Sequence, residues 1–185
     1  ETQEFDDYNK HIPEDKILCL PQELCQLGEG SIPVRNFCWE HSIKEGHKKH
    51  WILDDNLAEF FRWTKNIVTQ CNDSACFRQV EDLTDRYSNV YISGIQYKSM
   101  CPQISRNRPI VLKNCKVFSC CLYDNNMDVK LGLDDRWRGT YNEDIDLILR
   151  VLKKGGMTLQ IQNFTVNKKT TKSVKGGNAS SIYNV

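Results

Sequence analysis

The sequence contains no apolar run close to the roughly 20 residues that a membrane-spanning helix needs. No secretory signal peptide is visible either. The chain begins at Glu1 without a methionine, so we expect a piece of a longer protein, and a missing targeting segment then carries little weight. We expect no membrane association and a location inside the cell, in the nucleus or the cytoplasm.

The sequence also lacks any C-x-x-C pair, although it has nine cysteines, and it has only four histidines. This excludes the usual zinc-binding frameworks. Several cysteines sit in apolar runs such as 17–20 and 117–122, where cysteine behaves as a small hydrophobic residue. The odd count and the adjacent Cys120 and Cys121 argue against a disulfide framework, so a reducing compartment is favoured.

A strong excess of charge is missing too: the net charge of +1 does not by itself predict a nucleic-acid or membrane surface. The length suits a single domain over residues 1–185, and we find no internal repeats. Residues 166–185 form a basic, glycine-containing C-terminal loop. Its lysines are either solvated or face a phosphate group.

The hydrophobic periodicity predicts alternating helices and strands. We expect helices at 4–12, 34–46, 72–87 and 144–153, and strands at 16–20, 50–53, 90–92, 110–112, 115–122 and 158–166. The strand–loop–helix–strand order over 16–53 is typical of a parallel α/β sheet. In such sheets ligands bind at the carboxyl ends of the strands.

Residues 54–56, here called the first acidic segment, place Asp54, Asp55 and Asn56 directly after an apolar strand. Mg²⁺ and Mn²⁺ prefer such oxygens, with substrate phosphates completing the coordination. The alternative is a turn in which Asp and Asn cap a following helix. A buried strand that ends in two carboxylates favours the metal.

Residues 142–146, here called the second acidic segment, place Glu143, Asp144 and Asp146 at the start of an amphipathic helix. The helix dipole alone favours one or two acids there. A carboxylate at this position can also act as a general base toward an acceptor hydroxyl. Further on, Lys175, Gly176, Gly177 and Asn178 could bring backbone amides and charge to an oxyanion, although flexible tails look similar.

Together these segments suit glycosyl transfer from a nucleotide sugar, in which a metal and lysines neutralise a departing diphosphate while a carboxylate deprotonates an alcohol. The sequence also resembles a known family. The segments that carry the resemblance are 30–36, 39–42, 50–56, 137–144, the helix up to 150, and 175–178. They resemble the TET-associated glycosyltransferases over about residues 1–178, with 62–115 least distinctive. Relatives include phage enzymes, the base J glucosyltransferase and the vertebrate growth-regulation-by-oestrogen C-terminal domain.

The resemblance implies a GT-A-like α/β fold with a mostly parallel central sheet, here without its first strand–helix–strand. It implies a UDP- or GDP-sugar donor and a Mn or Mg cation held by Asp54, Asp55 and Asn56. Asp144 matches the catalytic acid of the family's "ED" motif, with Glu143 beside it. Arg35 and Asn36 lie near the donor by position, together with the 175–178 segment.

The leading hypothesis is therefore an inverting, metal-dependent glycosyltransferase. Its acceptor is a hydroxymethylated pyrimidine in DNA, by family analogy, or a protein. The alternative is a catalytically inactive scaffold of the same fold that binds a protein partner in the nucleus. A metal-dependent phosphoryl or nucleotidyl transferase would use similar acids.

Overall fold

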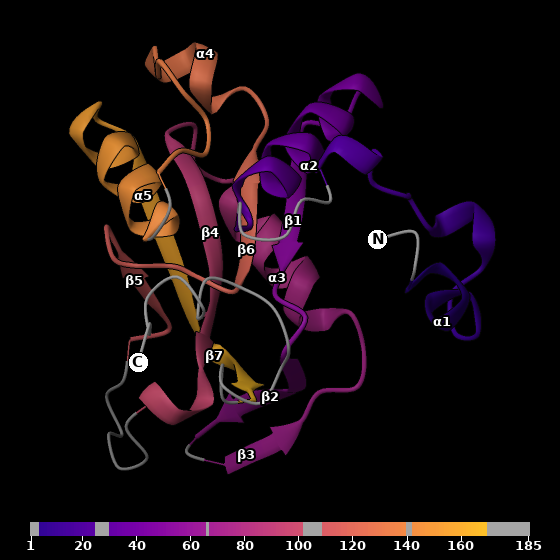
Figure 1. Ribbon diagram of the computed structural model, residues 1–185. Helices are drawn as coiled ribbons and strands as arrows, with labels where there is room; N and C mark the ends of the chain where they lie inside the picture. Colours follow the sequence, from indigo (N-terminus) through magenta and orange to yellow (C-terminus); the bar gives the residue numbers. More distant parts are fainter. Residues whose placement is uncertain (1–3, 25–29, 66, 102–108, 140–141, 170–185) are drawn as a thin grey trace, which may run out of the picture.

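The computed structural model describes residues 4–24, 30–65, 67–101, 109–139 and 142–169 (Figure 1). The helices are α1 (Phe5–Asn9), α2 (Ile32–Lys44), α3 (Ala75–Thr84), α4 (Met127–Leu131) and α5 (Glu143–Lys153). Short 3-10 turns occur at η2 (Glu14–Lys16), η3 (Gln22–Leu24) and η4 (Lys98–Met100). The strands are β1 (Lys49–Leu53), β2 (Leu57–Thr64), β3 (Ile67–Gln70), β4 (Val90–Tyr97), β5 (Val111–Lys113), β6 (Cys120–Asp124) and β7 (Met157–Lys168).

The seven strands form one sheet in the order β1-β6-β4-β7-β2-β3, with β5 also paired to β7. An α/β fold is confirmed, but the expected mostly parallel sheet is wrong. Within the described residues only β4 and β7 pair in parallel, and the other pairings are antiparallel. A parallel pair needs a crossover between its strands. Here the segment that contains α5 returns the chain to the start of β7 beside β4.

The expected strand at 16–20 is also wrong. Residues 14–16 form a 3-10 turn, and the side chain of Leu18 is 51% exposed. An apolar run becomes a strand only where a sheet edge pairs with it, and β1 pairs with β6 alone among the described strands. Helix α2 therefore does not connect two neighbouring parallel strands, which was the basis for the parallel prediction.

Strand directions nevertheless bring three carboxyl ends to one edge of the sheet. β1 runs antiparallel to β6, and β6 runs antiparallel to β4, so β1 and β4 point the same way. β7 runs parallel to β4. The residues that follow β1 and those that end β4 and β7 therefore share an edge, here called the carboxyl edge.

Side chains of the sheet alternate between two hydrophobic clusters, as the period of two requires. Cys121 and Tyr123 of β6 pack in the cluster that contains Trp39 of α2 and Leu147 of α5. Cys120 and Leu122 pack in the other cluster, with Val80 of α3. The cysteine-rich strand is therefore core, and burial raises the pKa of the Cys121 thiol to about 12. None of the helices in the described ranges combines the length and the apolar character of a membrane span.

The lowered pKa of His50 on β1 leads to a prediction about how the stability of the protein depends on pH. Burial lowers its pKa below 6.5, although the hydrogen bond between Nδ1 and Asn125 Oδ1 opposes the shift. The unfolded chain therefore takes up a proton near pH 6.5 that the folded chain resists. We expect the thermal unfolding midpoint to fall as the pH drops below about 6.5, until the lowered folded-state pKa is passed.

Thermal unfolding between pH 5 and 8 measures this effect. His50→Gln should flatten the profile, whereas His11→Gln, at an exposed position, should leave its shape unchanged. An equally steep profile in His50→Gln would contradict the assignment to His50.

Candidate functional site

The first acidic segment lies at the carboxyl edge, as predicted. Asp54 follows β1 directly, and its backbone N–H donates to the carbonyl oxygen of Ser119 at 2.8 Å, which ties it to the start of β6. Its side-chain oxygen Oδ2 accepts hydrogen bonds from Ser119 Oγ at 2.5 Å and from Lys168 Nζ at 2.8 Å. Lys168 is the last residue of β7, so three strands contribute to this contact.

Arg35 connects the two acidic segments. Its guanidinium lies 3.0 Å from Glu143 Oε1 and 3.6 Å from Asp54 Oδ1. The three side chains are only 17%, 10% and 23% exposed, so their charges interact with little screening by water. Segments nearly 90 residues apart in the sequence therefore border one site, which neither pattern alone could reveal.

Helix α5 begins with the second acidic segment. Asn142 precedes it with a φ of 56°, a left-handed conformation that Asn tolerates. Glu143 is buried, and its Oε1 also accepts a hydrogen bond from Ser31 Oγ at 3.0 Å. Ser31 precedes α2, so the amino ends of both helices meet here. Their partial positive charges favour an anion at this position.

Asp144 is the candidate base, and its environment suits that role. Burial raises the pKa of its carboxyl group, and the charge of Glu143 adds to the shift, although the hydrogen bond from the Ile145 N–H to Oδ1 opposes it. A carboxylate whose pKa is raised toward neutrality is a better proton acceptor at working pH. The charge of Arg35 also acts on Asp144, so Glu143 and Asp144 both belong to this site.

Asn36 follows Arg35 in the chain, but its side chain hydrogen-bonds to the backbone of Trp137. Its Nδ2 donates to the carbonyl oxygen of Trp137 at 3.1 Å, and its Oδ1 accepts from the Trp137 N–H at 3.0 Å. The Trp137 ring in turn lies 4.7 Å from the guanidinium carbon of Arg35. Asn36 thus holds the ring that supports Arg35, and its amide is committed to this contact.

The remaining residues of the first acidic segment differ in exposure. Asp55 is exposed. Asn56 is buried: its Nδ2 donates to the carbonyl oxygen of Lys169 at 3.4 Å, and its Oδ1 has no hydrogen-bond partner among the described residues. No group of three or more acidic, histidine or cysteine side chains placed to hold a metal occurs in the described part of the chain.

These oxygens fit a divalent cation in one particular way. Mg²⁺ and similar ions are commonly held by one or two carboxylates while substrate phosphates supply further ligands. Asp55 has an exposed carboxylate, the Asp54 carboxylate is paired with Lys168 and Arg35, and Asn56 Oδ1 is a buried acceptor without a partner among the described residues. The donor set therefore suits a cation that arrives with a diphosphate.

Some predicted site residues lie outside the described residues, and some residues around Asp54 were not predicted. Lys175, Gly176, Gly177 and Asn178 lie outside the described residues. Lys168, Ser119 and Tyr97 were not predicted as individual site residues. Lys168 and Ser119 contact Asp54 directly, and Tyr97 contacts Lys168. Only the basic character of the expected 166–185 loop hinted at Lys168, which instead ends β7, so the expected start of the loop at 166 is wrong. Ser119 and Tyr97 carry no sequence signal that marks them.

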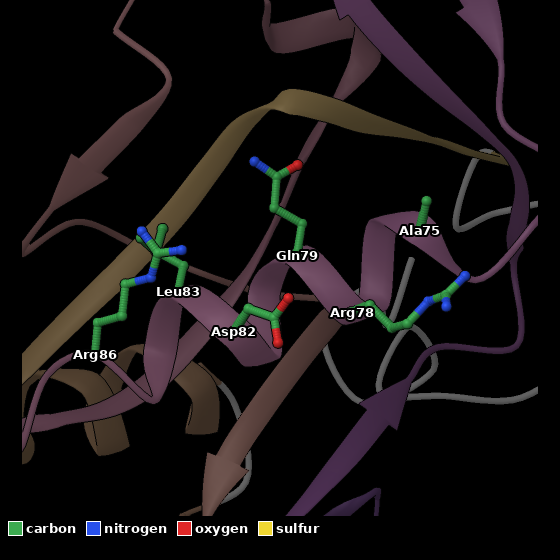
Figure 2. Close-up of a pocket in the computed structure, with 6 residues that line it drawn as sticks. All are labelled: Ala75, Arg78, Gln79, Asp82, Leu83 and Arg86. Carbon is green, nitrogen blue, oxygen red and sulfur yellow. The ribbon is translucent and has the colours of Figure 1, made fainter.

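A surface groove of about 390 Å³ lies elsewhere, along one face of α3 (Figure 2). Its lining residues are Ala75, Arg78, Gln79, Asp82, Leu83 and Arg86. None of them contributes to the contacts at the carboxyl edge described above. The chemistry of the acidic segments is therefore not located in this groove.

The carboxyl edge of this α/β sheet thus brings together acidic side chains, basic side chains and the amino ends of two helices. The model of the TET-associated glycosyltransferase family matches residues 1–177, and the chain belongs to this family. No curated protein and no solved structure matches the chain. The predicted family is thus confirmed.

Proposed function

We propose that this protein transfers a sugar from a nucleotide-sugar donor to an acceptor hydroxyl, with inversion at the sugar carbon. Membership of a glycosyltransferase family supports the reaction class. The observation that carries the proposal is the Arg35 bridge, because it joins the donor-side acid Asp54 to the start of α5. Donor and acceptor groups must be adjacent for direct transfer.

The donor diphosphate would lie at the carboxyl edge, where Arg35, Lys168 and the amino ends of α2 and α5 supply positive charge. These groups stabilise the charge that develops as the nucleoside diphosphate leaves. Asp54 and Asp55 would hold a Mn or Mg ion, which supplies Lewis acidity to the leaving diphosphate. The 175–178 segment, outside the described residues, is a further candidate for contact with the same diphosphate.

Asp144 would accept the proton of the acceptor hydroxyl, while Glu143 keeps Arg35 in place. The raised pKa of Asp144 supports this division, because Glu143 is already ion-paired and buried. Direct attack by a deprotonated hydroxyl inverts the sugar carbon. For the acceptor we propose a hydroxymethylated pyrimidine in DNA, with a protein hydroxyl as the competing outcome.

Calorimetric titration with UDP-glucose, GDP-sugars and free UDP, with and without Mn²⁺, tests the donor site. We expect cation-dependent binding of one nucleotide class and a loss of about tenfold or more in Asp54→Asn. Asp128→Asn is a matched control, because Asp128 pairs with Arg136 away from the carboxyl edge. Turnover with hydroxymethylated DNA and with proteins then identifies the acceptor.

Absence of nucleotide-sugar binding in the folded wild-type protein would favour the inactive scaffold instead. Release of sugar 1-phosphate, with the nucleoside monophosphate carried to the acceptor, would indicate a nucleotidyl transferase. Either result would overturn the proposed glycosyl transfer.

A further inference from the structure

The ammonium group of Lys168 forms an ion pair with Asp54, the carboxylate that is proposed to bind the divalent cation. Its Nζ lies 2.8 Å from Asp54 Oδ2, while the guanidinium of Arg35 lies 3.6 Å from the other oxygen, Oδ1. Both oxygens of Asp54 therefore face cations of the protein itself. A second cation at this carboxylate meets repulsion from the first.

The ammonium of Lys168 is held by more than its ion pair. It donates to Ser119 Oγ at 2.8 Å and to Tyr97 Oη at 3.4 Å, and the Tyr97 ring centre lies 5.6 Å away. Ser119 Oγ donates in turn to Asp54 Oδ2. Lys168 and Asp54 are only 21% and 23% exposed, so water screens the pair weakly. These contacts hold the ammonium group in a defined position beside Asp54.

A diphosphate changes this balance because it brings new negative charge beside Asp54. The ammonium on its flexible four-carbon stem can then pair with phosphate oxygens, which leaves the Asp54 carboxylate to a metal ion. Without the diphosphate, a metal ion must displace Lys168 from all three of its partners. The free energy needed to break these contacts therefore lowers the affinity for a metal ion that binds without the diphosphate.

We propose that Lys168 makes binding of a divalent cation at Asp54 conditional on a nucleoside diphosphate. This inference rests on the proposed function of the same site. Metal and nucleotide then bind with positive coupling, and the coupling is reciprocal: each raises the affinity of the other by the same factor. Lys168 sets the size of that factor because it competes with the metal only while the diphosphate is absent.

The test measures Mn²⁺ affinity without and with saturating UDP in the wild type and in Lys168→Met. For the wild type we expect weak Mn²⁺ binding that UDP strengthens by about 30-fold, a typical coupling. In Lys168→Met, Mn²⁺ alone should bind about tenfold tighter, and the factor that UDP contributes should shrink accordingly. Lys168→Arg keeps the charge and should resemble the wild type.

Three controls separate this effect from a general change of charge or folding. Lys113→Met removes an exposed lysine of β5 and should leave both Mn²⁺ affinities unchanged. Adding Asp54→Asn to Lys168→Met should abolish the tighter Mn²⁺ binding. If Lys168→Met does not fold, Lys168→Gln, which keeps a hydrogen-bond donor for Asp54, should change Mn²⁺ affinity in the same direction.

Unchanged Mn²⁺ affinity in folded Lys168→Met or Lys168→Gln would overturn the proposal, as would tight Mn²⁺ binding to the wild type without UDP. The Mn²⁺ comparison needs no sugar transfer. A wild type that shows the expected coupling with UDP but transfers no sugar would thus overturn the glycosyltransferase function and leave the role of Lys168 supported.

Discussion

Asp144→Asn is expected to lower sugar transfer by about 10²- to 10⁴-fold, the usual contribution of a general base. The substituted amide cannot accept the proton of the attacking hydroxyl, although its size is nearly unchanged. Donor binding should be preserved, because Asp54, Arg35 and Lys168 remain. Single-turnover transfer and UDP titration measure the two effects separately.

Stability should move in the opposite direction from activity. Because the pKa of Asp144 is raised in the folded state, its ionisation costs stability as the pH rises from 3.8 through the folded-state pKa. At neutral pH the full cost is present. Asp144→Asn removes it and should leave the thermal unfolding midpoint unchanged or higher, as expected for a functional carboxylate.

Asp146, two residues further along α5, is the matched control. Burial alone would raise the pKa of Asp146, but hydrogen bonds from Arg138 and Arg150 outweigh it and lower the pKa. Its ionised form therefore contributes stability above pH 3.8 that is lost as the pH falls through the lowered folded-state pKa. Asp146→Asn should destabilise the protein at neutral pH and leave transfer largely intact.

The opposite pattern would reassign the base. Full transfer activity in Asp144→Asn would remove Asp144 from the mechanism. Loss of transfer in Asp146→Asn with unchanged stability would instead make Asp146 the reacting carboxylate.

Arg35→Met is expected to affect both stability and donor binding. It leaves Asp54 and the buried Glu143 without the guanidinium that joins them, which we expect to cost about 2 kcal/mol of unfolding free energy, less than for a fully buried pair. Donor affinity should fall by about tenfold or more, because a cation near the diphosphate is lost. Chemical denaturation and UDP titration measure these changes.

A double-mutant cycle with Glu143→Gln separates the two effects of Arg35. Removing both charges together should restore part of the lost stability, because no buried carboxylate is then left unpaired. Donor affinity should not recover. Arg35→Lys should fall between, since a lysine retains the charge but cannot contact two carboxylates in the fork geometry of arginine. Recovery of donor affinity in the double variant would show that Arg35 acts only by positioning Glu143.

The sequence predicted those parts of the site that depend on local patterns. The apolar run before Asp54 forms β1, and the amphipathic pattern after Asn142 forms α5 with its acids in the first turn. Helices α2 and α3 and strands β4, β5 and β7 also lie close to their expected ranges, whereas β6 starts at Cys120 and overlaps the expected 115–122 strand only at 120–122. Short-range hydrophobic periodicity and helix-end preferences suffice for these elements.

Local patterns failed where a distant partner decides the outcome. The run at 16–20 has the composition of a strand, but the sheet does not extend to it. Strands β2 and β3 pair as a hairpin that the sequence did not predict, and all residues of β3 are exposed. Pairing direction is likewise a property of two strands together, so the predicted parallel sheet was wrong.

The sequence by itself thus determined the family, the apolar strand that presents Asp54 and the acidic start of α5, because each depends on residues close together in the chain. Only the tertiary structure decided which charges face one another. Lys168 contacts Asp54 across 114 positions, and Ser31 contacts Glu143 across 112. Such contacts require the sheet to order its strands and bring their carboxyl ends to one edge. The partners of each carboxylate follow from the topology of the whole fold.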